Sequence, residues 1–182
     1  MASQIGSMNN VKIFVLYLMK NINYPMDFVT INDVVMQTDY IMYLDFAVAF
    51  HQMVDDDLIF KIEEEGTDAL YQITEKGILV AESLSSDILS SILDKSLAAA
   101  FRYLDFKSRG IVAKCRYEET GAAEYTVFCE LIERDKVIFS TKVTVDSKDR
   151  ALRMTDNFRD RPEVIYRGLH ALLAGNVNYL FD

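Results

Sequence analysis

Apolar residues near the start of the chain recur at steps of three and four, which predicts a helix with one buried face. Asn10 is the expected N-cap, because a short polar side chain there can accept a hydrogen bond from the first turn. The helix ends between Asn21 and Pro25, since a residue before proline disfavours helical angles. Thr30 is expected to open a second, short helix. The predicted buried positions of both helices are Val11, Phe14, Val15, Leu18, Met19, Val34 and Val35.

A third helix is predicted from Met42 to Val54. Three acids follow it and oppose the helix dipole, so the helix stops there, with Asp57 in the left-handed conformation that often follows a helix. The predicted inward face consists of Tyr43, Phe46, Ala47, Phe50, Met53 and Val54. At 100° per residue, the opposite face presents Ile41, Asp45, Val48 and Gln52.

A β-hairpin, which we call the wing, follows the third helix in the predicted order of elements. Its strands are Leu58 to Ile62 and Ala69 to Ile73, rich in residues that favour extended backbone. The wing is acidic at its tip, and Lys61 is its one cation. The charged residues assigned to the wing are Lys61, Glu63, Glu64 and Glu65.

A long helical stretch is predicted from Ile78 to Phe106, with Thr74 as the cap of its first helix and a break within Ser83 to Asp87. An apolar stripe of this length needs cover from the rest of the chain or from a second subunit. We therefore expect a homodimer. The stripe consists of Ile88, Leu89, Ile92, Leu93, Leu97, Ala100, Phe101 and Leu104.

The period of the apolar residues then changes from helical spacing to two, which predicts a three-stranded antiparallel meander with turns at Glu119 to Ala123 and at Arg134-Asp135. Two closing helices follow, and the second runs from Pro162 to just before Gly175. The predicted fold class is α+β. We expect a first domain over residues 11–84 and a second over 85–182. Residues 1–7 are set aside, because Gly6-Ser7-Met8 resembles a cloning junction.

The end of the third helix and the return strand of the wing resemble winged-helix regulators. Those proteins typically close the recognition helix with leucine-x-x-x-Gly-leucine-isoleucine and return from the wing into tyrosine-x-leucine-threonine-x-x-glycine. Here Asp57-Leu58-Ile59 and the run from Tyr71 to Gly77 match, with Asp57 in place of the glycine. The whole chain is also similar to an uncharacterised bacterial family that joins a winged helix to a C-terminal sheet-and-helix domain. The resemblance implies a fold and supplies no catalytic residue.

Charge is distributed unevenly along the chain, whose formal net charge is −9. Residues 1–87 hold four Lys/Arg and fourteen Asp/Glu, whereas residues 88–182 hold fifteen and fourteen. Duplex DNA repels an acidic surface, because affinity for its backbone comes largely from basic groups. On the predicted outer face of the third helix, Gln52 could pair with adenine, and no side chain there suits guanine.

Basic residues of the second half gather in two places. Lys114, Arg116 and Lys142 share the polar face of the meander, and five arginines lie on the closing helices. One interpretation is ion pairing across strands and with the acidic half. The other is a patch that binds an anion or an effector. The five arginines are Arg150, Arg153, Arg159, Arg161 and Arg167.

Other chemistry is not indicated by the sequence. Cys115 and Cys129 are the only cysteines and are expected to be reduced and buried. His51 and His170 lack nearby ligands at metal spacing, and the runs of consecutive acids do not follow the alternation of a calcium loop. No phosphate loop or nucleophile motif is present. We therefore expect no enzyme activity, no metal and no cofactor.

Two functions remain open on this sequence. The first is a cytoplasmic, dimeric winged-helix transcriptional regulator that binds DNA weakly. The second is a module that reuses the same fold to bind a protein, or to sense a ligand, without binding DNA. No membrane span is expected, because no apolar run approaches the ~18 residues that a membrane helix needs.

Overall fold

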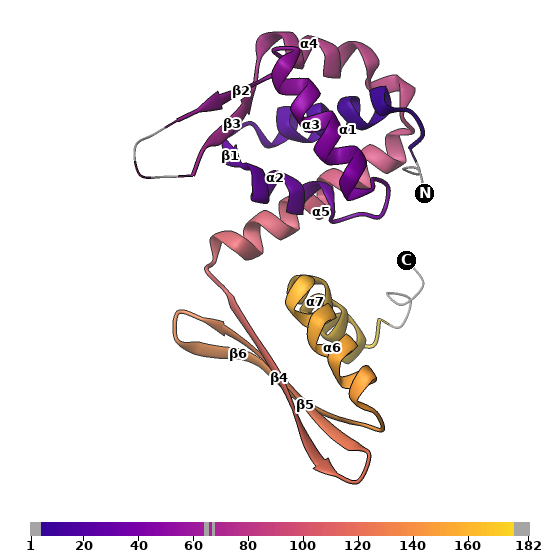
Figure 1. The fold of residues 1–182 in the computed structure, drawn as a ribbon, viewed down its shortest axis with the longest axis vertical. Helices are drawn as coiled ribbons and strands as arrows, with labels where there is room; N and C mark the ends of the chain where they lie inside the picture. Colours follow the sequence, from indigo (N-terminus) through magenta and orange to yellow (C-terminus); the bar gives the residue numbers. More distant parts are fainter. Residues whose placement is uncertain (1–4, 64–65, 67, 177–182) are drawn as a thin grey trace. The chain divides into compact units, whose positions relative to one another are not determined.

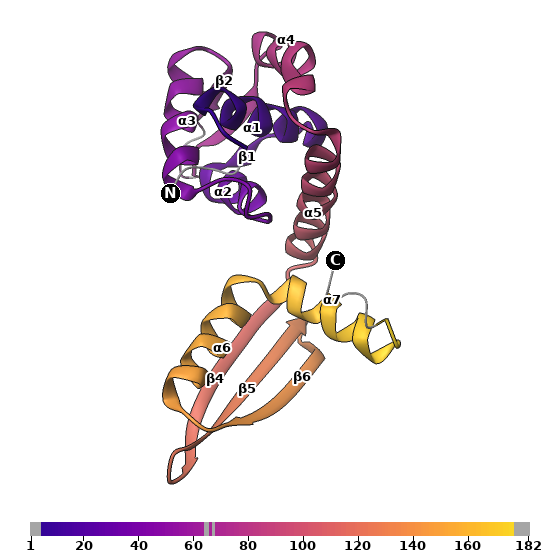
Figure 2. The ribbon, with the colours of Figure 1, turned by 90° about the vertical axis from the view of Figure 1, so that its right-hand side faces the viewer.

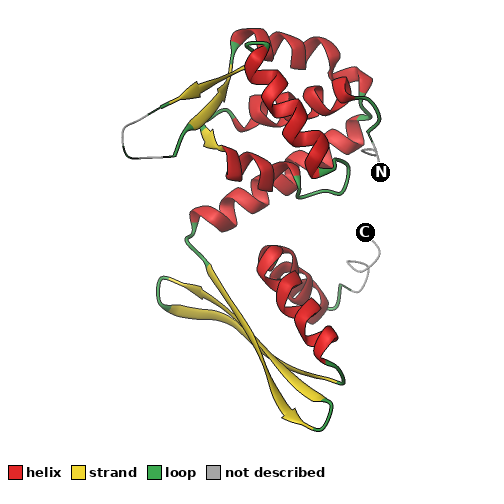
Figure 3. Cartoon of the chain, viewed as in Figure 1, coloured by secondary structure: helices red, strands yellow, loops and turns green. Residues whose placement is uncertain are grey.

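A computed structural model describes residues 5–63, 66 and 68–176, and confirms the predicted α+β class (Figure 1). The described residues contain seven α-helices and two three-stranded antiparallel sheets (Figure 3). The chain forms two compact units, residues 1–104 and 105–182. This division lies later than the boundary predicted after Leu84, because Ile88, Leu93 and Ala100 are buried in the apolar core of the first unit.

The first unit is helical, with a small sheet whose strand order is β1-β3-β2. Tyr71 of β3 lies at the centre of this sheet, opposite Met26 on one side and Lys61 on the other. The elements are α1 (Met8–Ile22), β1 (Met26–Asp27), α2 (Phe28–Val35), α3 (Tyr43–Asp55), β2 (Ile59–Ile62), β3 (Leu70–Ile73), α4 (Glu75–Leu84), a 3-10 turn (Ser85–Asp87) and α5 (Ser90–Ser108), which crosses into the second unit.

Two predicted helix starts are wrong. Ser7, and not Asn10, caps α1, and its hydroxyl accepts the Asn10 N–H at 3.3 Å. Asp27, and not Thr30, caps α2, and its carboxylate accepts the Thr30 N–H at 2.8 Å. Within the segment set aside as a cloning remnant, Ile5 is buried in the core of the first unit.

Aromatic rings form the part of the core that fixes α3 against α2 and the sheet. Phe50 of α3 meets Phe28 of α2 and Tyr71 of β3 edge to face, with ring centroids 4.8 Å apart in both pairs. Phe46 lies beside the same rings, 5.6 Å from Phe28. Such contacts orient rings as well as burying area, so α3 is held in one rotation about its axis.

The helical segment that follows β3 is interrupted within the range that the sequence predicted. Thr74 caps α4 by accepting the Gly77 N–H at 3.0 Å, and the 3-10 turn separates α4 from α5. The predicted stripe is covered only in part. Leu89, which directly precedes α5, and Phe101 of α5 are exposed, whereas Leu93 is buried in the core.

The second unit is a three-stranded meander with two helices. Its strands are β4 (Val112–Gly121), β5 (Glu124–Glu133) and β6 (Lys136–Val145), in the order β4-β5-β6. α6 (Lys148–Asp160) contacts all three strands, and α7 (Pro162–Leu173) follows it (Figure 2). The first predicted turn is shorter than expected because β4 continues to Gly121. The second is confirmed at Arg134 and Asp135, which both have positive φ.

One face of this sheet carries the core of the second unit. Cys115, Val127, Cys129 and Leu131 are buried there together with Phe158 of α6. On α7, Ile165 packs against this core, while Val164 and Leu173 are exposed. The opposite face of the sheet presents the alternate residues of each strand.

Candidate functional surfaces

The exposed face of α3 is the first candidate surface. Phe46, Ala49, Phe50 and Met53 are buried, which leaves the opposite side of the helix to solvent. On that side Leu44 is 74% exposed and Val48 is 48% exposed, and Gln52 is exposed one turn further on. We call Leu44, Val48 and Gln52 the α3 face. No Lys or Arg occurs anywhere in α3.

Three residues near this helix do not lie as the sequence suggested. Ile41 is only 4% exposed, because it precedes the helix and turns into the core, where the helical rotation does not apply. Asp45 is half-buried. Tyr43, expected to face inward, is exposed at the first turn. Leu44 was missed, and its place four residues before Val48 could have revealed it.

All four lysines of residues 1–87 are engaged with acidic or carbonyl oxygens. Lys12 contacts the Asp56 carboxylate at 3.0 Å, and Lys76 donates to the Asp56 backbone carbonyl at 2.6 Å. Lys20 pairs with a glutamate of α4 at 2.8 Å. The fourth, Lys61, pairs with Glu63 in the hairpin at 2.5 Å. Each of these four lysines therefore already has an oxygen partner within the protein.

In the β2–β3 hairpin, the ion pair between Lys61 and Glu63 keeps both side chains charged. The hydrogen bond between Lys61 and Glu63 raises the pKa of Lys61 and lowers the pKa of Glu63. Both groups are therefore charged at neutral pH, and they compensate each other. Phe60 of β2 is exposed beside them. Glu64 and Glu65, which we also assigned to the hairpin, lie outside the described residues.

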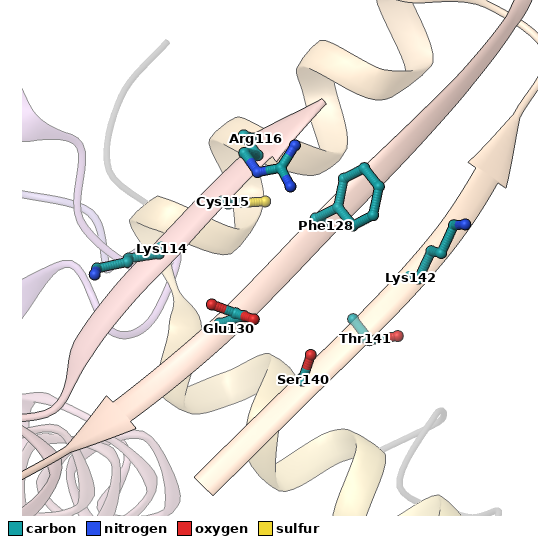
Figure 4. Close-up of a pocket in the computed structure, with 8 residues that line it drawn as sticks. All are labelled: Lys114, Cys115, Arg116, Phe128, Glu130, Ser140, Thr141 and Lys142. Carbon is teal, nitrogen blue, oxygen red and sulfur yellow. The ribbon is translucent and has the colours of Figure 1, made fainter. Parts of the chain in front are cut away.

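The second candidate surface lies on the β4-β5-β6 sheet, around Phe128 (Figure 4). Arg116, Phe128 and Lys142 are cross-strand neighbours in one row. The Arg116 guanidinium carbon lies 4.3 Å from the centre of the Phe128 ring, and the Lys142 ammonium lies 5.6 Å from it. We call this depression of about 410 Å³ the sheet patch; it is lined by Lys114, Cys115, Arg116, Phe128, Glu130, Ser140, Thr141 and Lys142.

The structure brings the three predicted patch residues together, and it adds residues that the sequence analysis missed. Phe128 is the most important of these, because both Arg116 and Lys142 lie against its ring. A signal for it was available. Phe128 is an aromatic residue on the polar face of its strand, out of phase with buried Val127 and Cys129.

The other candidate residues are dispersed. Arg150 pairs with Asp146 at 3.3 Å, and Arg159 donates to the Cys115 carbonyl at 2.8 Å. Both arginines therefore make contacts within the second unit. His51 and His170 lie in different units. Across the described ranges, no group of three or more His, Cys, Asp or Glu side chains could hold a metal ion.

No helix in the described part of the chain combines the length and the apolar character that a bilayer crossing requires.

The sequence profile of a family described as a domain of unknown function, DUF4364, matches residues 11–173. The chain belongs to the DUF4364 family. The match spans both compact units, so the DUF4364 domain includes the α3 face and the sheet patch together. Neither the curated proteins nor the solved structures contain a match to this DUF4364 chain.

Proposed function

We propose that the first unit of this DUF4364 protein is a winged helix. Support comes from the order α1-β1-α2-α3-β2-β3 and from the antiparallel arrangement β1-β3-β2, in which the β2–β3 hairpin is the wing. In that fold α2 and α3 form the helix-turn-helix, and α3 is the recognition helix. The left-handed backbone of Asp57 is consistent with its place in the glycine position of the winged-helix motif.

We further propose that this winged helix binds a protein, and that the molecule is a non-enzymatic, cytoplasmic interaction module. One observation carries this proposal: α3 exposes Leu44 and Val48 and has no cation, while every lysine of residues 1–87 is already engaged. A DNA reader needs basic groups that reach phosphates. An exposed apolar strip on a helix suits a protein partner.

The partner that fits is a protein segment with apolar side chains flanked by Lys or Arg. Leu44 and Val48 would bury the apolar side chains, and the exposed acids Asp55 and Asp57 at the end of α3 would attract the basic ones. Complementary charge of this kind steers association and selects partners.

A substitution on the α3 face tests this proposal. Val48→Arg places a cation in the centre of the face and should abolish capture of the partner from a cell extract by the full-length protein. Val112→Arg is the matched control, since Val112 is similarly exposed, at 54%, but lies on β4. We expect the control to retain the partner, and the captured segment to contain basic and apolar residues. Equal capture by both variants would overturn the proposal.

The second candidate function is a DNA-reading transcriptional regulator. Gln52 favours it, because its exposed amide could pair with adenine from a recognition helix. Fluorescence polarisation with a labelled duplex separates the two functions. The protein module predicts no binding at micromolar protein, even at low salt, whereas nanomolar affinity at physiological ionic strength would establish the regulator in its place.

A homodimer is part of the proposal. Leu89, just before α5, is 70% exposed, and Phe101 of α5 is also exposed, so the start and middle of this helical segment keep apolar area that a second copy could cover. Sedimentation equilibrium checks this point. A 20.9 kDa species at all concentrations would rule the dimer out.

A further inference from the structure

We propose that the sheet patch binds a small organic oxyanion, with its phosphate or carboxylate group bound by the cationic side chains that line the depression, among them Arg116 and Lys142. This site is separate from the α3 face, since it lies in the second unit, and it does not depend on the function proposed for the first. The argument rests on the arrangement of cations around one aromatic ring and on the polar groups next to it.

The register of the sheet places the two cations. Arg116 of β4 and Lys142 of β6 both lie opposite Phe128 of the central strand. Their charged groups lie 4.3 Å and 5.6 Å from the centre of the same ring. In Figure 4 the ring of Phe128 lies between the two side chains. A ring holds cations near it through its quadrupole. Phe128 thus holds one cation on each side of its ring, at the surface of the depression.

Among the three cations of the patch, only Arg116 forms an ion pair with a carboxylate of the sheet. Arg116 pairs with Glu118, which lies on the same strand. Within residues 5–63, 66 and 68–176, neither Lys114 nor Lys142 has a carboxylate at ion-pair distance. Glu130 faces Lys114 across the β4–β5 ladder without such a contact. Cross-strand ion pairing, the alternative interpretation of these basic residues, therefore does not account for the two lysines.

The next row of the sheet supplies groups for the rest of a ligand. Lys114, Glu130 and Ser140 are cross-strand neighbours, and all three line the same depression. A hydroxyl and a carboxylate beside an apolar ring can bind the hydroxyl or amino groups of a small polar molecule. The volume of about 410 Å³ lies in the range of small-molecule sites, roughly 300–1,000 Å³.

The test is calorimetric titration of the full-length protein with three probes: inorganic phosphate, citrate and adenosine monophosphate. We expect saturable binding of at least one probe. Binding of inorganic phosphate or adenosine monophosphate would identify a phosphate group as the ligand, and binding of citrate would identify a carboxylate group. Lys142→Gln and Arg116→Gln should each weaken that binding at least tenfold. Lys136→Gln, which removes the same charge from β6 outside the patch, should change it less than twofold.

Three outcomes would overturn the inference. The first is no saturable heat with any of the three probes. The second is an equal loss of affinity in Lys136→Gln and Lys142→Gln, which would mean a general effect of net charge. The third is binding of a single-stranded thymidine decamer, measured by polarisation, in the absence of binding of the small probes, which would assign the patch to nucleic acid. Melting temperatures of the variants close to that of the wild type exclude misfolding as the cause of a loss.

Discussion

Cys115 of β4 lies directly opposite Cys129 of β5, and their sulfur atoms are 2.6 Å apart. Both thiols are free and buried in the apolar core of the second unit, as the sequence predicted. Burial raises the pKa of Cys129 to about 12, and the hydrogen bond with Cys115 adds to the rise. The thiolate of Cys129 is therefore scarce at any physiological pH.

Cys129 should resist alkylation while the protein is folded. Only the thiolate attacks iodoacetamide. Since an unperturbed thiol has a pKa of about 8.5, a pKa of about 12 lowers the thiolate fraction of Cys129 at pH 8 by roughly three orders of magnitude. The measurement is peptide mapping by mass spectrometry after timed labelling, with and without guanidinium chloride. Labelling of Cys129 at the same rate in both conditions would contradict the prediction.

Gly77 should not tolerate alanine. A Cβ atom there would lie 2.2 Å from the Leu58 carbonyl oxygen and 2.8 Å from Ile73 Cγ1. The Leu58 carbonyl also accepts the N–H and the hydroxyl of Thr74, at 3.0 and 3.1 Å, so it cannot move without weakening both bonds. Gly77→Ala should lower the free energy of unfolding by about 1–3 kcal/mol, as overpacking does.

Urea denaturation of Gly77→Ala, followed by circular dichroism, measures this loss. Gly121→Ala is the control, because a Cβ at Gly121 meets no atom closer than 3.5 Å. Its unfolding free energy should stay within about 0.5 kcal/mol of the wild type. Equal unfolding free energies of Gly77→Ala and Gly121→Ala would contradict the prediction, since they would mean that the backbone near Leu58 moves aside at no cost.

Asp27 should be needed as the cap of α2. Its carboxylate accepts the N–H and the hydroxyl of Thr30, at 2.8 and 2.5 Å. Asp27→Ala leaves that N–H without its cap and should cost about 0.5–2 kcal/mol of unfolding free energy. Asp27→Asn keeps a side-chain oxygen and should lose less. Urea denaturation of both variants checks the order, and an Ala variant as stable as the Asn variant would contradict it.

The capping residues show where prediction from sequence stops. Amphipathic periodicity located the helices and the longer strands, because burial of one face fixes the period of apolar residues. The two-residue strand β1 was not predicted. The helix starts were missed because two acceptable caps lie three positions apart in each case, Ser7 and Asn10, then Asp27 and Thr30. The choice between them depends on tertiary packing, such as that of Phe28 on Phe50, which local sequence does not contain.

The candidate surfaces were predicted less well than the elements that carry them. Val48 and Gln52 are exposed as the helical rotation requires, but Ile41 precedes the helix and is buried. The patch around Phe128 depends on the register of three strands, which brings Arg116 and Lys142 to one ring. Strand alternation places a side chain on a face, but only the pairing of strands decides its neighbours.

The ion pair between Arg109 and Glu133 should make the second unit less stable in acid. The guanidinium donates to both carboxylate oxygens, with Nε–Oε1 at 3.0 Å and Nη2–Oε2 at 2.8 Å. These hydrogen bonds lower the pKa of Glu133. A carboxyl group with a lowered pKa in the folded state stabilises the fold above its unfolded pKa, about 4.3, and this contribution is lost as pH falls through the folded pKa.

Glu133→Gln should therefore lower the melting temperature at pH 7, and the difference from the wild type should shrink as pH falls below about 4. Thermal melts followed by circular dichroism between pH 7 and pH 3 measure this convergence. Glu119→Gln is the control, since Glu119 is exposed on β4 and makes no ion pair among the described residues. A constant difference between Glu133→Gln and the wild type at every pH would trace the effect to side-chain shape, because a charge interaction must disappear once the carboxylate of Glu133 is protonated.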